Sequence, residues 1–136
     1  MATVIIIDDS KTSTKIIRTA LENDGLTVIG EAANGEEGYL LYKELHPDIV
    51  TMDVTMPIMD GIEALSLIKR EDSRAKVIMI TAAGQKEKMV EAIKRGADEF
   101  ILKPFEPSDL INTVHRLLDG DEEEELDLEA MFGGQE

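Results

Sequence analysis

Five polar residues follow short apolar runs of the sequence and carry side chains suited to phosphoryl transfer. Asp8 and Asp9 follow the first run, Asp53 ends the third, Thr81 follows the fourth and Lys103 follows the fifth. Clustered carboxylates repel one another unless a positive charge lies among them, and an all-oxygen set of ligands suits Mg²⁺. A lysine ammonium and a threonine hydroxyl can each contact a phosphate oxygen, and an aspartate can act as the nucleophile that forms an acyl phosphate. The residue types therefore predict a phosphoryl-transfer site with a magnesium ion, provided that the fold gathers them.

These residues can meet only if the apolar runs are strands of one parallel sheet. The runs occupy residues 4–7, 28–29, 49–52, 77–80 and 100–102. They are rich in β-branched residues, which favours strands, and most lack polar alternation, which is typical of strands covered on both faces. In an open α/β sheet a ligand binds beyond the carboxyl ends of the strands, which is where the five polar residues lie.

The segments that follow the runs have the apolar spacing of amphipathic helices. Asn34 and Asp60 each precede a glutamate by three residues, as in a capping box, and predict the starts of the second and third helices. The fourth helix is expected from Gln85 to Arg95 and the fifth from about Pro107. Inward-facing residues are expected to include Ile16, Ile17, Ala20 and Leu21 in the first helix, and Leu110, Ile111, Val114, Leu117 and Leu118 in the fifth. Five strand–helix repeats predict an α/β fold with helices on both faces of a parallel sheet.

Length and charge limit the classes of protein to which the chain can belong. Its 136 residues suit one domain, which we divide into residues 1–119 and an acidic tail at 120–136. A net charge of −15 argues against binding to nucleic acid, which depends on basic residues that contact phosphates. The sequence has no apolar run long enough for a membrane span, no cysteine and no recognisable signal peptide, so we expect a cytoplasmic protein without membrane insertion or disulfides.

Four motifs at the expected strand ends carry a resemblance to a known family. They are Asp8-Asp9-Ser10, Met52-Asp53-Val54-Thr55-Met56-Pro57-Ile58-Met59-Asp60-Gly61, Thr81-Ala82 and Lys103-Pro104-Phe105. With all four in order, residues 3–118 resemble a response regulator receiver domain of two-component signalling, and most of all the stand-alone, CheY-like chemotaxis regulators. The resemblance implies a flavodoxin-like doubly wound (βα)5 fold, with a five-stranded parallel sheet in the order 2-1-3-4-5.

The resemblance also implies a role for each residue of the site. Asp53 would be the phosphoacceptor, charged by a sensor histidine kinase. Mg²⁺ would be held by Asp8, Asp9, Asp53 and the backbone carbonyl of Thr55. Lys103 would contact the phosphoryl group, and the bond from Lys103 to Pro104 is expected to be cis. Such a domain catalyses only its own phosphorylation and dephosphorylation.

Such a domain would signal by changing the shape of the surface that it presents to a protein partner. Thr81 and Phe100 would form the switch pair, although many chemotaxis members have tyrosine at the position of Phe100. The fourth helix, fifth strand and fifth helix, here called the output face, would control a protein partner such as a flagellar motor switch protein. Thr55 and Ala83 stand where family members vary, and are expected to tune dephosphorylation. We expect a monomer.

Three alternatives share part of this chemistry. A phosphorelay intermediate would pass the phosphoryl group from Asp53 to a histidine phosphotransferase. A phosphatase of the haloacid dehalogenase type also uses an aspartyl nucleophile, but needs a second aspartate two positions later, where this chain has Thr55. A flavodoxin-like FMN carrier needs a hydroxyl-rich phosphate loop after the first strand, where this chain has Asp8 and Asp9.

Several candidate residues also have simpler interpretations. Asp8 and Asp9 are suited to capping a helix, and Phe100 is suited to a place in the core. His46 and His115 lack an evident base, nucleophile or metal partner, so we expect both on the surface without a catalytic role.

The acidic tail has two interpretations. Residues 120–136 contain eight acidic residues and no basic residue, a composition typical of disordered, solubilising segments. However, Leu128, Met131 and Phe132 would share one face of a helix. That face could bind to the output face and compete with the partner, using as a landing site the basic residues of the fourth helix: Lys86, Lys88, Lys94 and Arg95.

Overall fold

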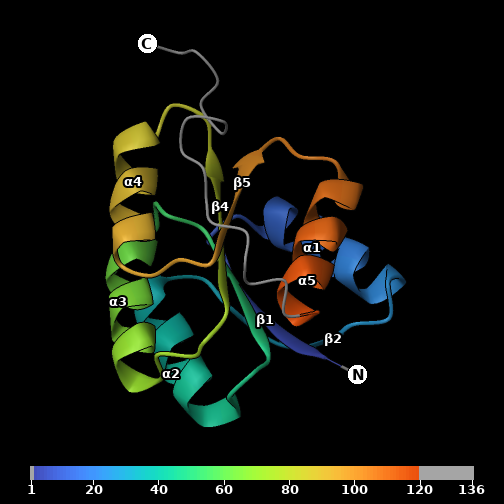
Figure 1. Ribbon diagram of the computed structural model, residues 1–136, viewed down its shortest axis with the longest axis horizontal. Coiled ribbons are helices and arrows are strands. Elements are labelled where there is room, and N and C mark those ends of the chain that lie inside the picture. The colour runs from blue at the N-terminus through green and yellow to red at the C-terminus, as the bar shows by residue number, and fades with distance from the viewer. Residues whose placement is uncertain (1, 120–136) are drawn as a thin grey trace.

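The structure is a computed structural model that describes residues 2–119, so the predictions for the tail at 120–136 lie outside the described residues. The strands are β1 (Thr3–Ile7), β2 (Thr27–Ala32), β3 (Ile49–Met52), β4 (Val77–Ala82) and β5 (Glu99–Lys103). The helices are α1 (Lys11–Asn23), α2 (Gly35–Leu45), α3 (Gly61–Glu71), α4 (Lys86–Lys94) and α5 (Pro107–Leu118), and they alternate with the strands (Figure 1). Every strand pair is parallel and the order is β2-β1-β3-β4-β5, which confirms the predicted flavodoxin-like fold. None of the described helices is long and apolar enough to cross a bilayer.

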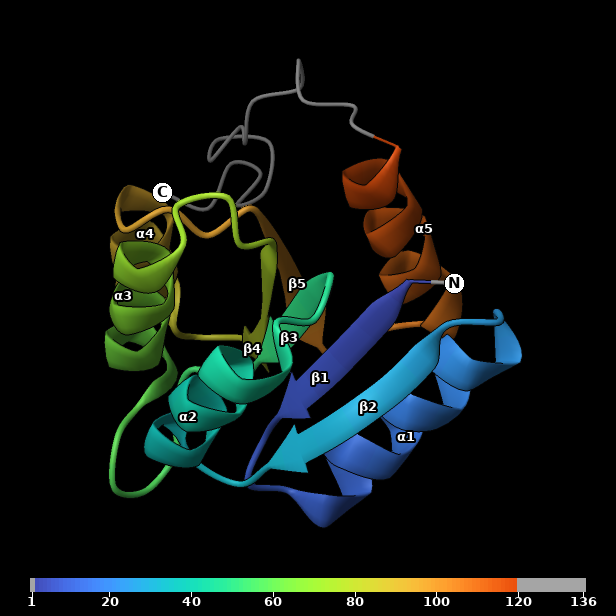
Figure 2. The same ribbon diagram turned by 90° about the horizontal axis from the view of Figure 1, so that it is seen from below.

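Helices cover both faces of the sheet. Figures 1 and 2 show α1 and α5 on one face, and α2, α3 and α4 on the other. Successive side chains of a strand point to opposite faces. In β1, Ile5 and Ile7 therefore join the apolar cluster under α2, α3 and α4, whereas Val4 and Ile6 join the cluster under α1 and α5. All four are completely buried, which explains why this run lacks polar alternation.

Side-chain caps fix the starts of three helices. The Asn34 side chain accepts a hydrogen bond from the backbone N–H of Glu37 at 2.9 Å, and the Asp60 side chain accepts one from that of Glu63 at 2.9 Å. Ser10 caps α1 in the same way at 3.1 Å. Each cap satisfies an N–H that has no partner inside the helix. The helix starts predicted at Asn34 and Asp60 are thus confirmed.

Two residues that were predicted to face the core are exposed. Ile16 is 49% exposed and Leu118 is 37% exposed. Ile17 and Leu21 are fully buried, and Ile16 lies about 100° around the helix from Ile17, which places it beyond the flank that faces the sheet. Leu118 is the last residue of α5, beyond the buried residues Leu110, Thr113 and Val114 of that helix.

Three strands extend beyond the ends that the sequence indicated. Thr81 lies inside β4 and Lys103 is the last residue of β5, opposite Ala82, whereas both were expected just after their strands. Their backbones are therefore held by the sheet and not by a loop. Strand β2 also runs on to Ala32, past Glu31, because an edge strand tolerates a polar residue that faces solvent.

His115 has a partner that the sequence did not reveal. Its Nε2 lies 2.6 Å from Oδ2 of Asp24. Asp24 caps the end of α1 and His115 lies in α5, so the pair joins the two helices on one face of the sheet. The expectation of a surface position is confirmed, but the expectation that His115 lacks a partner is wrong.

Candidate functional site

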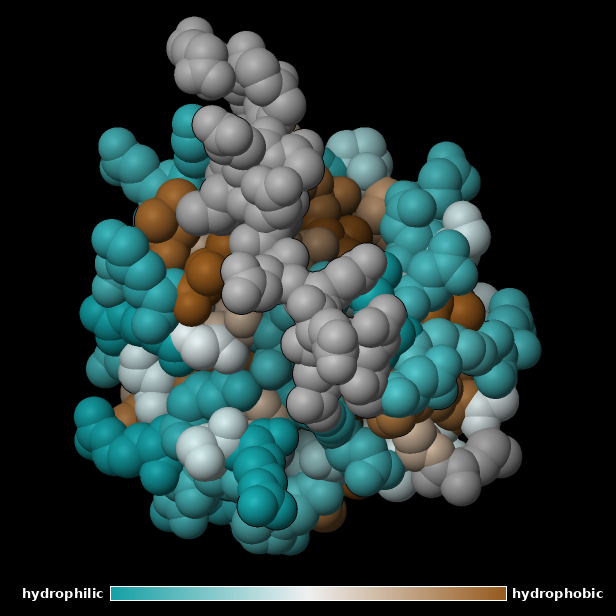
Figure 3. All heavy atoms as spheres, viewed as in Figure 1, coloured by the Kyte–Doolittle hydropathy of each residue, from teal (hydrophilic) through white to brown (hydrophobic). Residues whose placement is uncertain are grey.

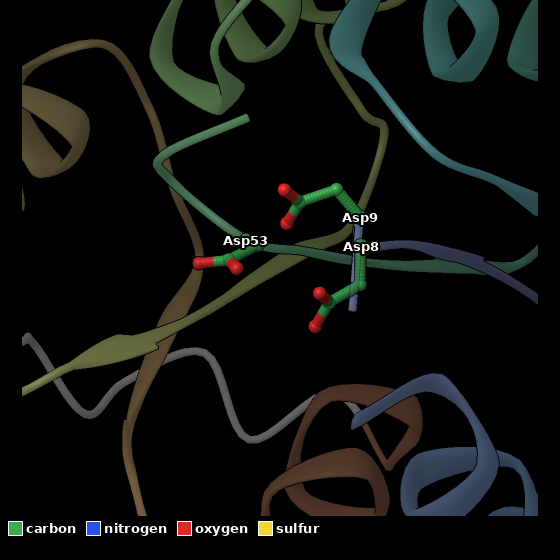
Figure 4. Close-up of side chains that lie close together, drawn as sticks. All are labelled: Asp8, Asp9 and Asp53. Atoms are coloured by element: carbon green, nitrogen blue, oxygen red, sulfur yellow. The ribbon is translucent and has the colours of Figure 1, made fainter. Parts of the chain in front are cut away.

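Three acids from neighbouring strands meet at one end of the sheet. Asp8 and Asp9 follow β1, and Asp53 follows β3, which lies beside β1. One carboxylate oxygen from each residue lies within 4.8 Å of the other two. Figure 4 shows the three side chains gathered at this edge. Asp8 is buried, Asp53 is half-buried and Asp9 is exposed, so a ligand can reach the cluster from solvent.

Lys103 places an ammonium group between two of these acids. Its Nζ lies 3.0 Å from Oδ2 of Asp8 and 3.3 Å from Oδ2 of Asp53. The side chains of all three residues are largely shielded from water, with exposed fractions of 21% for Lys103, 2% for Asp8 and 13% for Asp53. The peptide bond from Lys103 to Pro104 is cis. Ion pairs with so little water around them are screened less than pairs on the surface.

Backbone N–H groups hold the remaining oxygens of two acids. Oδ1 of Asp8 accepts a hydrogen bond from the N–H of Ser10 at 2.9 Å. Oδ1 of Asp53 accepts one from the N–H of Val54 at 2.7 Å. Each of these carboxylates therefore has one oxygen on the backbone and the other on Lys103, which fixes its orientation.

The electrostatics of the site favour a further positive charge. Partial burial raises the pKa of Asp53, the charge of Asp8 raises that pKa further, and Lys103 opposes both effects without cancelling them. Burial tends to lower the pKa of Lys103, but the hydrogen bond to Asp8 and the charges of both acids outweigh burial and leave this pKa raised. Burial is thus the main reason for the raised pKa of Asp53, whereas the two acidic partners Asp8 and Asp53 are the reason for the raised pKa of Lys103.

The other predicted residues lie around this cluster. Thr81 is buried, and within residues 2–119 no hydrogen bond joins its hydroxyl to Asp53 or Lys103. Phe100 is 8% exposed and belongs to the core under α2, α3 and α4. Ala83 is exposed, and so is Thr55. The structure thus brings Asp8, Asp9, Asp53 and Lys103 together, while the predicted switch pair lies in β4 and β5.

Thr55 has a contact that sequence reasoning did not foresee. Its Oγ1 accepts a hydrogen bond from Nε2 of Gln85 at 3.3 Å. This contact joins the loop after Asp53 to the start of α4.

Gly61 is a second requirement that the sequence analysis missed. A Cβ atom at this position would lie 1.9 Å from the backbone oxygen of Asp53, so only glycine fits. The Gly61 N–H also donates to the backbone oxygen of Val54 at 2.7 Å.

The loop between Asp53 and α3 is held in an unusual path. Ile58 has φ of 71°, a conformation that β-branched residues rarely adopt. The N–H of Met59 donates to the oxygen of Pro57 at 2.7 Å, and the oxygen of Met59 accepts from the N–H of Gly35 at 2.8 Å. Contacts on both sides of Ile58 therefore hold this strained turn next to the acid cluster.

Comparisons with known proteins agree with this geometry. Residues 4–115 match the family described as response regulator receiver domain. The chain is 45% identical over 114 residues to a chemotaxis protein CheY of Thermotoga maritima, covering 84% of this chain and 95% of that protein. It is 47% identical over 118 residues to protein CcdB of Bacillus subtilis, covering 87% and 98%. A solved structure of a CheX-CheY-BeF3-Mg²⁺ complex from Borrelia burgdorferi has a TM-score of 0.82 and 38% identity, covering 86% of this chain and 89% of that one.

Proposed function

Because this chain belongs to the response regulator receiver domain family, we propose that it is a phosphoacceptor switch in which Asp53 receives a phosphoryl group from a sensor histidine kinase. The observation that carries this proposal is the position of Lys103, whose Nζ lies 3.3 Å from Asp53 beside the three-acid cluster. Relatives that are named chemotaxis proteins support control of chemotaxis as the output. A flagellar motor switch protein is the partner that fits this output.

The proposed reaction is the transfer of a phosphoryl group to a carboxylate oxygen. An oxygen of Asp53 attacks the phosphorus of a phosphohistidine, an O–P bond forms, and the N–P bond breaks. The imidazole nitrogen leaves with the electron pair, and the product is an acyl phosphate. Lys103 is close enough to neutralise one phosphoryl oxygen as the charge on the group develops. Attack by water on phosphorus would later release phosphate and restore the Asp53 carboxylate.

The acid cluster fits a divalent cation. Its donors are all oxygens, they lie within 4.8 Å of one another, and they carry more negative charge than Lys103 balances. Such a set suits Mg²⁺, which binds one or two carboxylates together with phosphate oxygens. We assign Asp8, Asp9, Asp53 and the backbone carbonyl of Thr55 as the residues that would hold it. When bound, the ion supplies charge neutralisation for the phosphoryl oxygens.

The proposed switch links this chemistry to the output face. A phosphoryl group on Asp53 adds negative charge and new acceptor oxygens, to which the Thr81 hydroxyl could donate. Phe100 lies two strand positions before Leu102, the residue opposite Thr81, and it also borders a surface cavity on the output face. Phosphorylation would act by favouring one of two existing arrangements of Thr81 and Phe100.

The test is labelling of the chain with a small-molecule phosphodonor such as acetyl phosphate. We expect the wild type to gain one phosphoryl group by intact mass in Mg²⁺, and to gain none in EDTA. Asp53→Asn should gain none under either condition. Asp60→Asn is the matched control, because asparagine also caps a helix well, and it should be labelled like the wild type. Equal labelling of Asp53→Asn and wild type would overturn the proposal.

A further inference from the structure

A surface groove runs along the edge of the sheet between β5 and α5. It is a cavity of about 440 Å³, here called the output groove, whose lining includes Phe100, Leu102, Phe105, Asn112, Thr113 and Arg116. Leu102 is 37% exposed there, although it is a large apolar residue. Figure 3 shows apolar surface in this region, around the end of β5 and between α4 and α5. Among residues 2–119, strand β5 pairs only with β4, so its outer edge also offers backbone hydrogen-bonding groups to a ligand.

The chain itself leaves the fold beside this groove. Arg116, in the last turn of α5, donates to Glu99 at the start of β5 with distances of 2.9 and 3.0 Å. The end of α5 therefore lies next to the beginning of β5. Along α5 the groove runs from Arg116 to Asp109, about 10 Å at the rise of a helix. Residues 120–125 can span about 20 Å when extended, so residues 126–132 can reach any part of the groove.

The composition of residues 126–132 matches the surfaces around the groove. The segment alternates apolar and acidic side chains at its start, Leu126-Asp127-Leu128-Glu129, and ends in Met131-Phe132. The residues before it, 121–125, are all acidic. The groove is lined by Arg116, which is paired with Glu99, and by one acid, Asp109; beyond β5 the helix α4 and its cap carry four basic residues, Lys86, Lys88, Lys94 and Arg95, against two acids. Apolar side chains suit the groove floor, and the acids suit its surroundings.

We propose that residues 126–132 bind in the output groove of the same molecule and occupy it in the unphosphorylated protein. The contact itself requires no phosphorylation. Its consequence, competition with an output partner for the groove, rests on the function proposed above. Coupling between two events is reciprocal. If phosphorylation weakens the contact between the tail and the groove, then removal of the tail must in turn favour phosphorylation.

The absence of cysteine from the chain allows a direct test. Gly134→Cys provides one attachment point for a nitroxide spin label in the full-length protein. Without phosphodonor or Mg²⁺, we expect the amide NMR signals of Leu102, Phe105 and Asn112 to lose most of their intensity, while those of Tyr39 and Lys43 in α2 keep theirs. Signals at the output groove that match those of the reduced, diamagnetic label would overturn the proposal.

Two matched substitutions and one mixture sharpen the test. Leu102→Asp in the labelled chain should restore the signals of Phe105 and Asn112. Leu40→Asp, at a leucine that is 55% exposed on α2, should leave the broadening in place. If the same broadening also appears when spin-labelled, unenriched chains are mixed with ¹⁵N-enriched, unlabelled chains, the occupant is the tail of a second copy and the intramolecular assignment is wrong. Because no arm of this experiment involves Asp53, its outcome is independent of the phosphorylation test.

Discussion

Lys103 lies closer to Asp8 than to Asp53, with Nζ–Oδ2 distances of 3.0 Å and 3.3 Å. Asp8 is also the more buried partner, with a side chain that is 2% exposed. Lys103 therefore has two tasks in the described structure. It compensates the charge of a buried carboxylate, and it remains within reach of a group that arrives at Asp53.

Replacing Lys103 should affect both stability and phosphorylation. Lys103→Met leaves the buried Asp8 carboxylate without its cation, so we expect the free energy of unfolding to fall by about 3 kcal/mol when Mg²⁺ is absent. Urea unfolding in EDTA measures this change. Labelling by acetyl phosphate should also slow. Lys15→Met, at an exposed lysine of α1, is the control and should unfold like the wild type. Equal stability of the two variants would contradict the assigned pairing.

Magnesium should stabilise the fold through Asp9. Asp9 is exposed and adds negative charge to the cluster, so Asp9→Asn should leave the metal-free protein at least as stable as the wild type. A ligand that binds only the folded state at a hundredfold excess over its Kd stabilises by about 2.7 kcal/mol. We expect the wild type to approach such a gain in Mg²⁺, as measured by thermal or urea unfolding, and Asp9→Asn to show little of it. Glu44→Gln on α2 should keep the full gain, and a loss there would point to an unspecific salt effect.

The contact between His115 and Asp24 should make the link between α5 and α1 depend on pH. The hydrogen bond to Asp24 is the main reason why the pKa of His115 is raised above its ordinary value of 6.5; the charges of Asp24 and Asp119 act in the same direction. A raised pKa in the folded state means that this contact contributes its full stability below the unfolded pKa. The contribution is lost as the pH rises through the folded pKa.

An NMR titration of the His115 ring measures this pKa. Asp24→Asn should move the His115 midpoint down toward the ordinary value, and Asp119→Asn should move it less, because Asp119 makes the smaller contribution. Identical midpoints in wild type and Asp24→Asn would refute the pairing.

The buried hydroxyl of Thr51 lowers the stability of the fold, and one substitution should remove this cost. Thr51 lies fully buried in β3, and its Oγ1 has no hydrogen-bond partner in the described part of the chain. Thr51→Val should therefore raise the free energy of unfolding by about 1 kcal/mol. Thr113→Val is the matched control, since Oγ1 of Thr113 donates to the backbone oxygen of Asp109 at 2.8 Å, and its loss should cost about 1 kcal/mol. Chemical denaturation of both variants should show changes of opposite sign in the free energy of unfolding.

The alternation of strands and helices follows from local patterns in the sequence, whereas the strand order that makes β1 and β3 neighbours came from the resemblance to the receiver family. The buried runs of β1 and β3 have no polar alternation, and Asn34 and Asp60 cap the helices that follow β2 and β3. Once the strands are parallel neighbours, the acids that end β1 and β3 must lie side by side. No distance between elements was needed for that prediction.

The features that the sequence analysis missed depend on how distant segments pack. The pairing of His115 with Asp24 spans 91 positions and requires that α5 lie against the end of α1. The need for glycine at position 61 arises from the backbone path of Asp53, which no pattern of apolar residues specifies. The exposure of Ile16 shows a related limit, because periodicity gives the inward face of a helix but not its width.

Strand β5 combines three tasks within five residues. Phe100 faces one core, Ile101 faces the other, and Lys103 reaches the acid cluster from the final position. A slip of one residue against β4 would exchange the faces of Phe100 and Ile101 and draw the ammonium back by about 3.3 Å. The register of β5 against β4 therefore determines two features together. It determines which side chain borders the output groove, and whether the Lys103 ammonium lies beside Asp53. An insertion or deletion within β5 would separate Lys103 from Asp53, the proposed phosphoacceptor, even where both cores could repack.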